Sequence, residues 1–180
     1  MLHAGDVLDL SPIGAIFQVR KTSQETQGRS FEMEWKLFPN SGGTPVHIHP
    51  HATESYEVLA GELDLYVDGS WRRVSAGEKA SVGPGIPHTF RNASNAPAHV
   101  YNTHAPAMRY TEYFEGLHRV VHSGAVPGGR MTLKAILYLS VLMTSYEEEI
   151  RSVKPPHALM RILALVATSL GYRVPPPSAD

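Results

Sequence analysis

Three candidate metal ligands lie close together in one stretch of the sequence, residues 47–63 (HIHPHATESYEVLAGEL). His47 and His49 are two residues apart, so in a β-strand their imidazoles point to the same face of a sheet. Pro50 ends regular strand pairing after them, and Glu54 opens the next strand with a carboxylate that can return to the same point. Two imidazoles and a carboxylate at one point suit a divalent transition metal. The stretch therefore predicts β-structure with a metal site on one face.

A fourth candidate ligand, His88, lies in a second stretch, residues 83–92 (GPGIPHTFRN). A Pro-Gly turn precedes it and a strand-like segment follows it. Three imidazoles and a carboxylate suit Fe, Mn, Ni, Cu or Zn, and such a site leaves one or two positions open to water or substrate. The alternative is a metal-free fold with a vestigial polar core. We favour metal binding, because four buried polar groups need partners.

The two stretches together resemble the paired motifs of the cupin superfamily. The first motif reads HxH, four residues, Glu, six residues and Gly, and the second reads Gly, five residues, Pro-x-Gly, two residues, His, three residues and Asn. Here the first is met by His47, His49, Glu54 and Gly61, and the second by Gly77, Gly83-Pro84-Gly85, His88 and Asn92. The resemblance covers about residues 30–105.

Two departures from the cupin motifs are visible. Gly83 stands where the family usually has Pro, and the leading Gly of the first motif is displaced, at Gly42 or Gly43. Both departures lie in turns, so they leave the four candidate ligands unchanged.

Alternating and turn-forming residues predict an all-β core. Residues 30–38 alternate, with Phe31, Met33, Trp35 and Leu37 on one face, which is typical of a half-buried strand. Asp68-Gly69 is a strong hairpin signal between two further strands. Many short strands separated by turns indicate a sandwich or barrel. The resemblance implies an antiparallel double-stranded β-helix, the jelly-roll or cupin barrel, with the metal inside.

The chain changes character after the predicted barrel, residues 1–105. Residues 106–130 read as a short helix, 108–117, ended by Gly116, and a Gly- and Pro-rich linker. Residues 131–172 read as a helical hairpin, with helices 131–151 and 157–170 and a Glu147–Arg151 pair four residues apart. Residues 173–180 read as a disordered tail.

The predicted helical hairpin is unusually apolar, since residues 135–146 and 162–172 carry no charge. Both runs are shorter than the roughly 20 apolar residues that a membrane span needs. We therefore favour packing on the barrel or on a second chain over membrane contact. A two-fold pair is the commonest way to cover such a surface, so we expect a homodimer whose interface includes part of residues 131–172.

Side chains alternate in direction along a strand, and this alternation predicts which residues line a substrate pocket. Tyr56 shares the parity of Glu54, while Phe90 and Asn92 share that of His88. Trp35 and Met33 complete the candidate pocket, although plain core packing is the alternative for these two and for Tyr56. Other residues are given lesser roles: His51 is expected to be exposed or to support a ligand, Glu57 to face outward, and His99, His104, His118 and His122 have no distinctive spacing.

The amino-acid composition indicates which kinds of binding partner and ligand to expect. Sixteen Lys and Arg against 17 Asp and Glu give a net charge of −1, without the basic excess typical of nucleic-acid binding. The absence of cysteine excludes disulfides and thiolate ligands. The N-terminal residues have no signal-peptide pattern, so we expect a cytoplasmic protein.

Two functions remain open at this stage. The resemblance implies chemistry of the dioxygenase type, as in quercetinase-like cupins, on a small apolar or aromatic substrate whose neighbouring oxygens chelate the metal. Glu54 is then the candidate catalytic residue, as a proton acceptor. The alternative is a non-catalytic module that binds or senses a small ligand. Because no helix-turn-helix segment precedes the predicted barrel, we disfavour a transcription factor.

Overall fold

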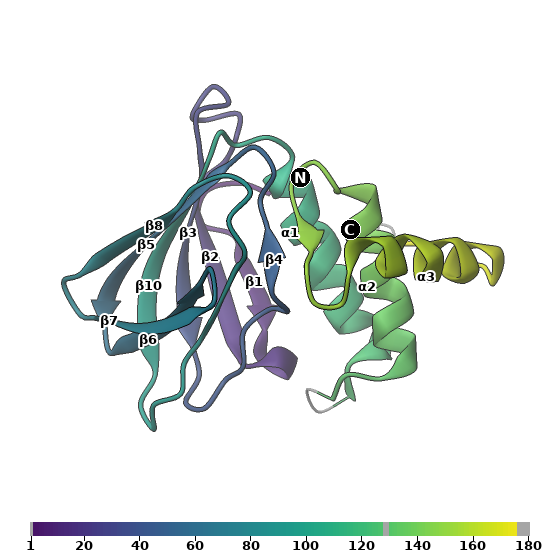
Figure 1. Cartoon of the computed structure of the whole chain (residues 1–180). Coiled ribbons are helices and arrows are strands. Elements are labelled where there is room, and N and C mark those ends of the chain that lie inside the picture. The colour runs from purple at the N-terminus through teal and green to yellow at the C-terminus, as the bar shows by residue number, and fades with distance from the viewer. Residues whose placement is uncertain (1, 128–129, 176–180) are drawn as a thin grey trace.

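The computed structural model describes residues 2–127 and 130–175, and the architecture below refers to these residues. Two antiparallel β-sheets face each other to form the barrel, and a layer of helices covers one side of it (Figure 1). The all-β core and its C-terminal helical extension confirm the fold class predicted from the alternation and the turns.

The larger sheet has six strands in the order β1-β2-β3-β10-β5-β8. Strand β3 lies between β2 and β10, and its alternating apolar residues point into the barrel with exposed fractions of 2% or less. The alternation therefore predicted the buried face correctly. The strands are β1 (Val7–Leu10), β2 (Ala15–Lys21), β3 (Phe31–Leu37), β5 (Thr53–Ala60), β8 (Lys79–Val82) and β10 (Ala98–Ala105).

The smaller sheet has five strands in the order β11-β4-β9-β6-β7. Asp68 and Gly69 connect β6 to β7 with positive φ angles of 44° and 96°, which is the backbone that a two-residue hairpin turn requires. The strands are β4 (His47–Ile48), β6 (Glu62–Val67), β7 (Ser70–Ser75), β9 (His88–Arg91) and β11 (Arg151–Ser152).

Aromatic side chains fill the space between the two sheets. Trp35 stacks on Phe17 with ring centroids 4.8 Å apart and lies against Phe90 at 4.9 Å. Because Trp35 comes from β3 and Phe90 from β9, this cluster joins the large sheet to the small one. A one-turn 3-10 helix, η1 (Ser11–Ile13), separates β1 from β2.

The first helix is longer than predicted. Helix α1 (Tyr110–Val120) does not end at Gly116 but runs into the single π-helical turn η2 (Val121–Ala125), so part of the predicted linker is helical. The glycine serves packing instead: a Cβ atom at position 116 would lie 2.6 Å from Cδ1 of Leu142. Gly116 thus allows α1 to approach the next helix, α2 (Leu133–Ser145), closely.

The segment after α2 differs most from the prediction. Helix α2 ends at Ser145 rather than at residue 151, and the chain turns to form β11, which pairs with β4 of the barrel. The barrel is therefore not complete at residue 105. Arg151 lies on β11 rather than on a helix, and it donates to the backbone carbonyl of Glu147 at 2.7 Å and to the carboxylate of Glu148 at 2.8 Å instead of pairing with the Glu147 carboxylate.

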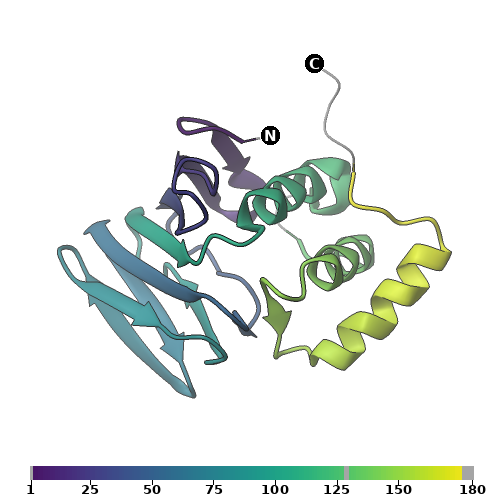
Figure 2. The same cartoon turned by 90° about the horizontal axis from the view of Figure 1, so that it is seen from above.

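The last helix, α3 (His157–Ser169), packs on α2 and lies farthest from the barrel (Figures 1 and 2). Gly171, with φ of 88°, follows its end in the left-handed conformation that glycine adopts easily. Of the predicted tail, residues 176–180 lie outside the described residues. Within the described part of the chain, each helix is too short or too polar to cross a bilayer.

Candidate metal centre

The structure brings together the four side chains that the two sequence stretches singled out. His47 lies on β4, His49 directly follows it, Glu54 lies on β5 and His88 begins β9. One ligand atom from each lies within 4.8 Å of the others, and each residue is 3% exposed or less. Since β5 belongs to the large sheet and the histidines to the small one, the group forms only when the barrel closes.

The carboxylate of Glu54 is the centre of the group. Its Oε2 lies 2.8 Å from Nε2 of His88 and 3.1 Å from Nε2 of His49. Its other oxygen, Oε1, accepts a 2.8 Å hydrogen bond from the side-chain amide of Asn102. One carboxylate oxygen thus points at the imidazoles while the second is held by β10.

Backbone carbonyls orient all three imidazoles. Nδ1 of His47 lies 2.8 Å from the carbonyl oxygen of Pro45, and Nδ1 of His88 lies 2.8 Å from that of Ile86. Nδ1 of His49 lies 2.7 Å from the carbonyl oxygen of Glu149. A carbonyl only accepts hydrogen bonds, so each Nδ1 carries a proton, and Nε2 is the nitrogen that faces the group. This is the usual arrangement of metal-binding histidines.

The electrostatics of the group also fit a divalent cation. Burial by itself raises the pKa of Glu54, but the imidazoles around the carboxylate, those of His104, His49 and His88, outweigh burial, so the pKa lies well below its usual range. Burial and the neighbouring imidazoles hold the pKa of His47 well below its usual value. An ionised carboxylate beside neutral imidazoles is the donor set that a transition metal takes.

His88 differs from His47. Burial lowers its pKa, yet the hydrogen bond and the charge of Glu54 outweigh burial, and the pKa lies above its usual value. Below this raised pKa both ring nitrogens of His88 carry protons, and Nδ1 donates to the Ile86 carbonyl while Nε2 donates to Glu54. The Nε2 proton lies on the nitrogen of His88 that would bind the metal, so a metal that binds here must displace it.

Sequence reasoning missed a fourth buried histidine, His104. It lies on β10 opposite Glu54, 2% exposed, with Nε2 3.5 Å from Oε1 of Glu54. Burial is the main cause that lowers its pKa to about 3, so the ring is neutral. The sequence indicates that His104 and Asn102, two residues apart, face the same side of a strand. It does not indicate that β10 lies beside β5, because the two strands are far apart along the chain.

The predicted pocket residues divide into two groups. Tyr56, Phe90, Trp35 and Met33 are buried inside the barrel, with exposed fractions of 6% or less. Asn92 does not line a pocket: its side-chain amide donates to the carbonyls of Phe38 and Ala96, at 3.1 and 2.8 Å, and its Oδ1 accepts from the Ser94 backbone. Asn92 therefore anchors the loops at the end of β9.

His51 and Glu57 lie near the ligands in the sequence but do not belong to the ligand group. His51 is exposed and contacts the Glu148 carboxylate at 2.7 Å. Glu57 faces away from the barrel interior and pairs with Lys79 on the neighbouring strand at 2.8 Å. Both positions agree with the sequence-based expectation that neither residue is a ligand.

Comparison with known proteins gives a family match over the barrel. Residues 33–104 match the family model described as the cupin domain. A 72-residue segment is 33% identical to quercetin 2,3-dioxygenase of Bacillus subtilis and covers 38% of this chain and 21% of that protein. A 106-residue segment is 23% identical to the HTH-type transcriptional regulator PuuR of Escherichia coli and covers 59% of this chain and 56% of that one. The chain thus spans between about a fifth and just over half of these relatives.

Solved structures share the barrel. An RmlC-like cupin from Shewanella frigidimarina superposes with a TM-score of 0.51 and 20% identity, over 59% of this chain and 88% of the other. KdgF from a Halomonas species superposes with a TM-score of 0.50 and 19% identity, over 59% and 90% of the two chains. At this level of identity the likeness shows a shared fold.

Proposed function

Because this chain belongs to the cupin superfamily, we propose that it is a metal-dependent oxidoreductase of the dioxygenase type that acts on a small, largely apolar or aromatic substrate. His47, His49, Glu54 and His88 would hold a divalent Fe, Mn, Ni, Cu or Zn ion, which would supply Lewis-acid activation and, if redox-active, chemistry with oxygen. A substrate with neighbouring oxygen atoms would be able to chelate such an ion.

The observation that carries this proposal is a set of buried polar atoms in the barrel that have no hydrogen-bond partner among the described residues. They include two donors, the hydroxyl of Tyr56 and the indole N–H of Trp35. They also include Oδ1 of Asn102 and Nδ1 of His104. An unsatisfied buried group costs about 1–3 kcal/mol, so these atoms favour an oxygen-bearing ligand that satisfies them.

The surroundings of these atoms favour an aromatic ligand. Trp35, Tyr56 and Phe90 form one aromatic cluster, with ring centroids 4.9–6.3 Å apart. The Glu54 carboxylate contributes, after burial, to a pKa of Tyr56 well above its usual range, so this hydroxyl remains a donor throughout the physiological range. The 33% identity to a quercetin 2,3-dioxygenase segment supports the same class of substrate.

Glu54 is the proposed proton acceptor. Its lowered pKa keeps the group ionised at physiological pH, which makes it available to take a proton from a substrate hydroxyl. Asn102 holds Oε1, so Oε2, which faces the imidazoles, is the atom that would receive the proton once it is detached from the metal.

The alternative function is a module that binds or senses a small ligand without turnover. The similarity to PuuR, 23% identity over 106 residues, favours this reading. Both functions use the same four ligands, so the metal site alone does not separate them.

Oxygen uptake separates the two functions. Protein purified without added metal is analysed for metal, then loaded with Fe or Mn and supplied with flavonol, catechol and enol substrates in an oxygen electrode. We expect oxygen consumption with at least one class, and none by a His49→Ala variant. Saturable ligand binding without oxygen consumption or product would reject the enzyme and support the sensing module.

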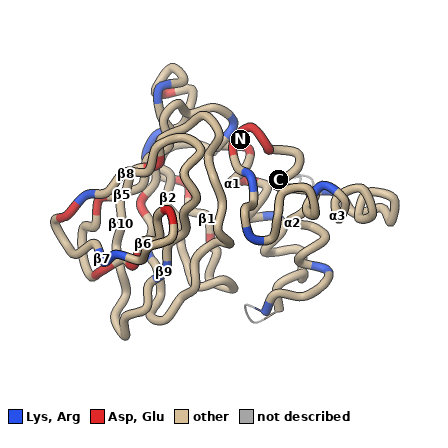
Figure 3. Tube along the Cα trace, in the orientation of Figure 1, with Lys and Arg blue, Asp and Glu red and all other residues tan. Residues whose placement is uncertain are grey.

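We also infer a homodimer formed through α3. Five apolar side chains on this helix or directly after it, Leu159, Ile162, Leu165, Val166 and Leu170, are between 44% and 72% exposed. Figure 3 shows this helix almost free of charged residues. Burial of a Leu or Ile side chain is worth about 1.5–3 kcal/mol, so an uncovered face of this size favours association.

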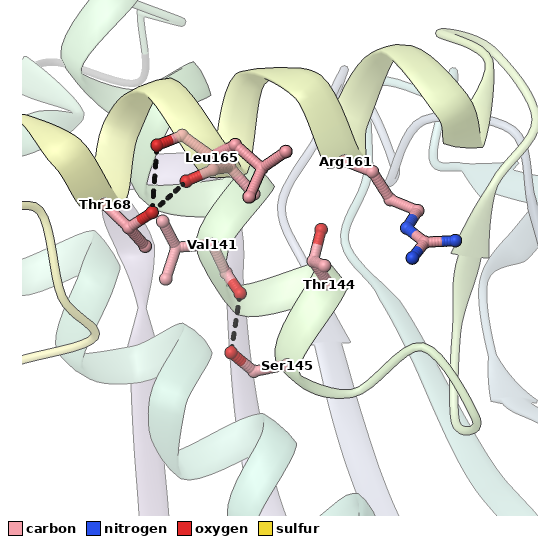
Figure 4. A pocket seen from close by; sticks show the side chains of 7 residues that line it. Val141, Thr144, Ser145, Arg161, Leu165 and Thr168 are labelled. Atoms are coloured by element: carbon pink, nitrogen blue, oxygen red, sulfur yellow. Dashed lines mark hydrogen bonds between the residues drawn. The ribbon is translucent and has the colours of Figure 1, made fainter.

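A second copy fits this face better than a membrane surface does. The one charged residue of α3, Arg161, lies 4.0 Å from Glu147 of the same chain, so two such faces meet without like-charge repulsion. Interfacial membrane helices instead carry several basic residues on the polar side. A groove of about 250 Å³ between α2 and α3, which Leu165 and Val141 help to line, extends this apolar surface (Figure 4).

A further inference from the structure

We propose that the C-terminal extension is a working part of the metal centre: Tyr110 and the main-chain carbonyl of Glu149 position His49 for metal binding. The inference concerns the metal site alone, so it holds for the enzyme and for the sensing module alike. Tyr110 belongs to α1 and Glu149 to the turn after α2, and both lie beyond the strands that carry the four ligands.

The three imidazoles differ in how far along the chain the carbonyl that orients each of them lies. His47 and His88 each bond the carbonyl two residues before them, Pro45 and Ile86, so their own loops hold them. His49 bonds the carbonyl of Glu149, which is 100 residues further along the chain. The extension must therefore be docked for His49 to point Nε2 at Glu54.

Tyr110 completes this contact. Its hydroxyl donates to the Glu149 carbonyl at 2.8 Å and lies 2.9 Å from Nδ1 of His49. A carbonyl oxygen has two lone pairs, so it accepts from Tyr110 and from His49 at once. The tyrosine ring is 1% exposed and packs on His104 with centroids 4.2 Å apart, which fixes the position of its hydroxyl.

The segment that carries Glu149 is itself attached to the ligand strand. Arg151 and Ser152 of β11 pair with Ile48 and His47 of β4. The amides of the next two residues, 153 and 154, both donate to the carbonyl of Val46, at 2.8 and 3.1 Å. Strand β4 pairs with β9 only through His47 and His88, so β11 supplies much of its backbone pairing.

Two consequences follow from this arrangement. Removal of the Tyr110 hydroxyl loosens His49 and weakens metal binding, although Tyr110 touches no metal. Conversely, a metal that fixes His49 also fixes the turn that contains Glu149, because coupling between two sites acts equally in both directions. Metal binding should then protect the backbone around residues 146–154 from hydrogen exchange.

The test uses the full-length protein with Tyr110→Phe and, as its matched control, Tyr113→Phe. Tyr113 lies one helical turn further along α1, is 6% exposed and packs on Phe114 and Tyr146 rather than on His49. Zn(II) affinity is measured by competition with a chelator, and Cu(II)-loaded protein is examined by electron paramagnetic resonance. We expect roughly 10–100-fold weaker Zn(II) binding and an altered copper spectrum for Tyr110→Phe, with wild-type values for the control.

Hydrogen exchange of the wild-type protein provides a second measurement that does not depend on how a variant folds. Addition of Zn(II) should slow exchange in residues 146–154, and Tyr110→Phe should reduce that protection. The inference would be overturned if Tyr110→Phe kept the wild-type Zn(II) affinity and copper spectrum. It would also be overturned if Zn(II) left the rate of hydrogen exchange in residues 146–154 unchanged. Neither measurement depends on turnover, so absence of oxygen uptake would reject the proposed dioxygenase and leave this inference standing.

Discussion

Oε2 of Glu54 lies 2.8 Å from Nε2 of His88, although β5 and β9 belong to different sheets. Below the pKa of His88 this contact is a carboxylate–imidazolium pair, and the Glu54 carboxylate raises that pKa above the usual 6.5 despite burial. When His88 is protonated, the proton on Nε2 therefore lies between the two sheets at the point where a metal would bind.

Metal affinity should depend on pH through His88. Below the raised pKa the metal must displace one proton from Nε2, so the dissociation constant should rise about tenfold per pH unit as the pH falls. Above that pKa the affinity should level off. Glu54 adds no proton in this range, because its pKa lies well below 4.5. Zn(II) titrations from about pH 5.5 to about pH 8.5 check this, and a flat profile would contradict the proposed proton displacement.

The pair of His88 and Glu54 should contribute to the stability of the metal-free protein with the opposite trend. It acts against His47 and His104, whose lowered pKa values make stability fall as the pH drops below 6.5. The pKa of His88 is raised on folding, so the pair contributes stability that is present below pH 6.5 and is lost as the pH rises through the raised pKa. Thermal unfolding of metal-free protein in the same titration series measures the net of these contributions.

Replacement of a single ligand should remove the metal without unfolding the barrel. His49→Ala deletes one imidazole but leaves the Tyr110 hydroxyl on the Glu149 carbonyl, so we expect loss of most bound metal and about 1 kcal/mol of stability. Metal analysis and thermal unfolding measure the two effects. Glu57→Ala is the control, since it removes only an exposed pair with Lys79 and should keep the metal. Full metal content in His49→Ala would reject the ligand assignment.

Gly43 is required for a close approach between backbones. A Cβ atom there would lie 1.6 Å from the carbonyl oxygen of Phe90, so Gly43→Ala must push the loop before β4 away from β9. We expect a loss of about 1–3 kcal/mol in the free energy of unfolding, and weaker metal binding because that loop carries the carbonyl that orients His47. Gly42→Ala is the matched control: a Cβ there meets nothing within 4 Å, so chemical denaturation should show a change within about 0.5 kcal/mol.

A charge on α3 should abolish the proposed dimer. Leu165 is 72% exposed on the apolar face, so Leu165→Glu places a carboxylate in the interface and should give a monomer with unchanged metal content. Sedimentation at micromolar concentration measures the change. Leu59→Glu makes the same substitution at a 42% exposed position on β5 and should leave the dimer intact. A wild-type monomer would reject the interface, and binding of the wild-type protein to lipid vesicles would favour the membrane alternative.

The sequence by itself determined the barrel and the composition of the ligand group. Spacing of two residues places His47 and His49 on one face, and alternation places Phe31, Met33, Trp35 and Leu37 inside, because the direction of a side chain in a strand depends only on its own backbone. The same local reasoning found the Asp68-Gly69 hairpin. It misjudged Asn92, because parity gives a direction and does not identify the carbonyls that a side chain meets there.

Only the tertiary structure decided how the ligands are held. His104 became a neighbour of Glu54 because β10 pairs with β5, and His49 found its carbonyl 100 residues away because α2 stops at Ser145 and lets β11 join β4. Helix periodicity continues through this stretch, so no local pattern marks the stop. The competing interaction is pairing with a strand that is distant in sequence, and its free energy enters only when the two segments meet in space.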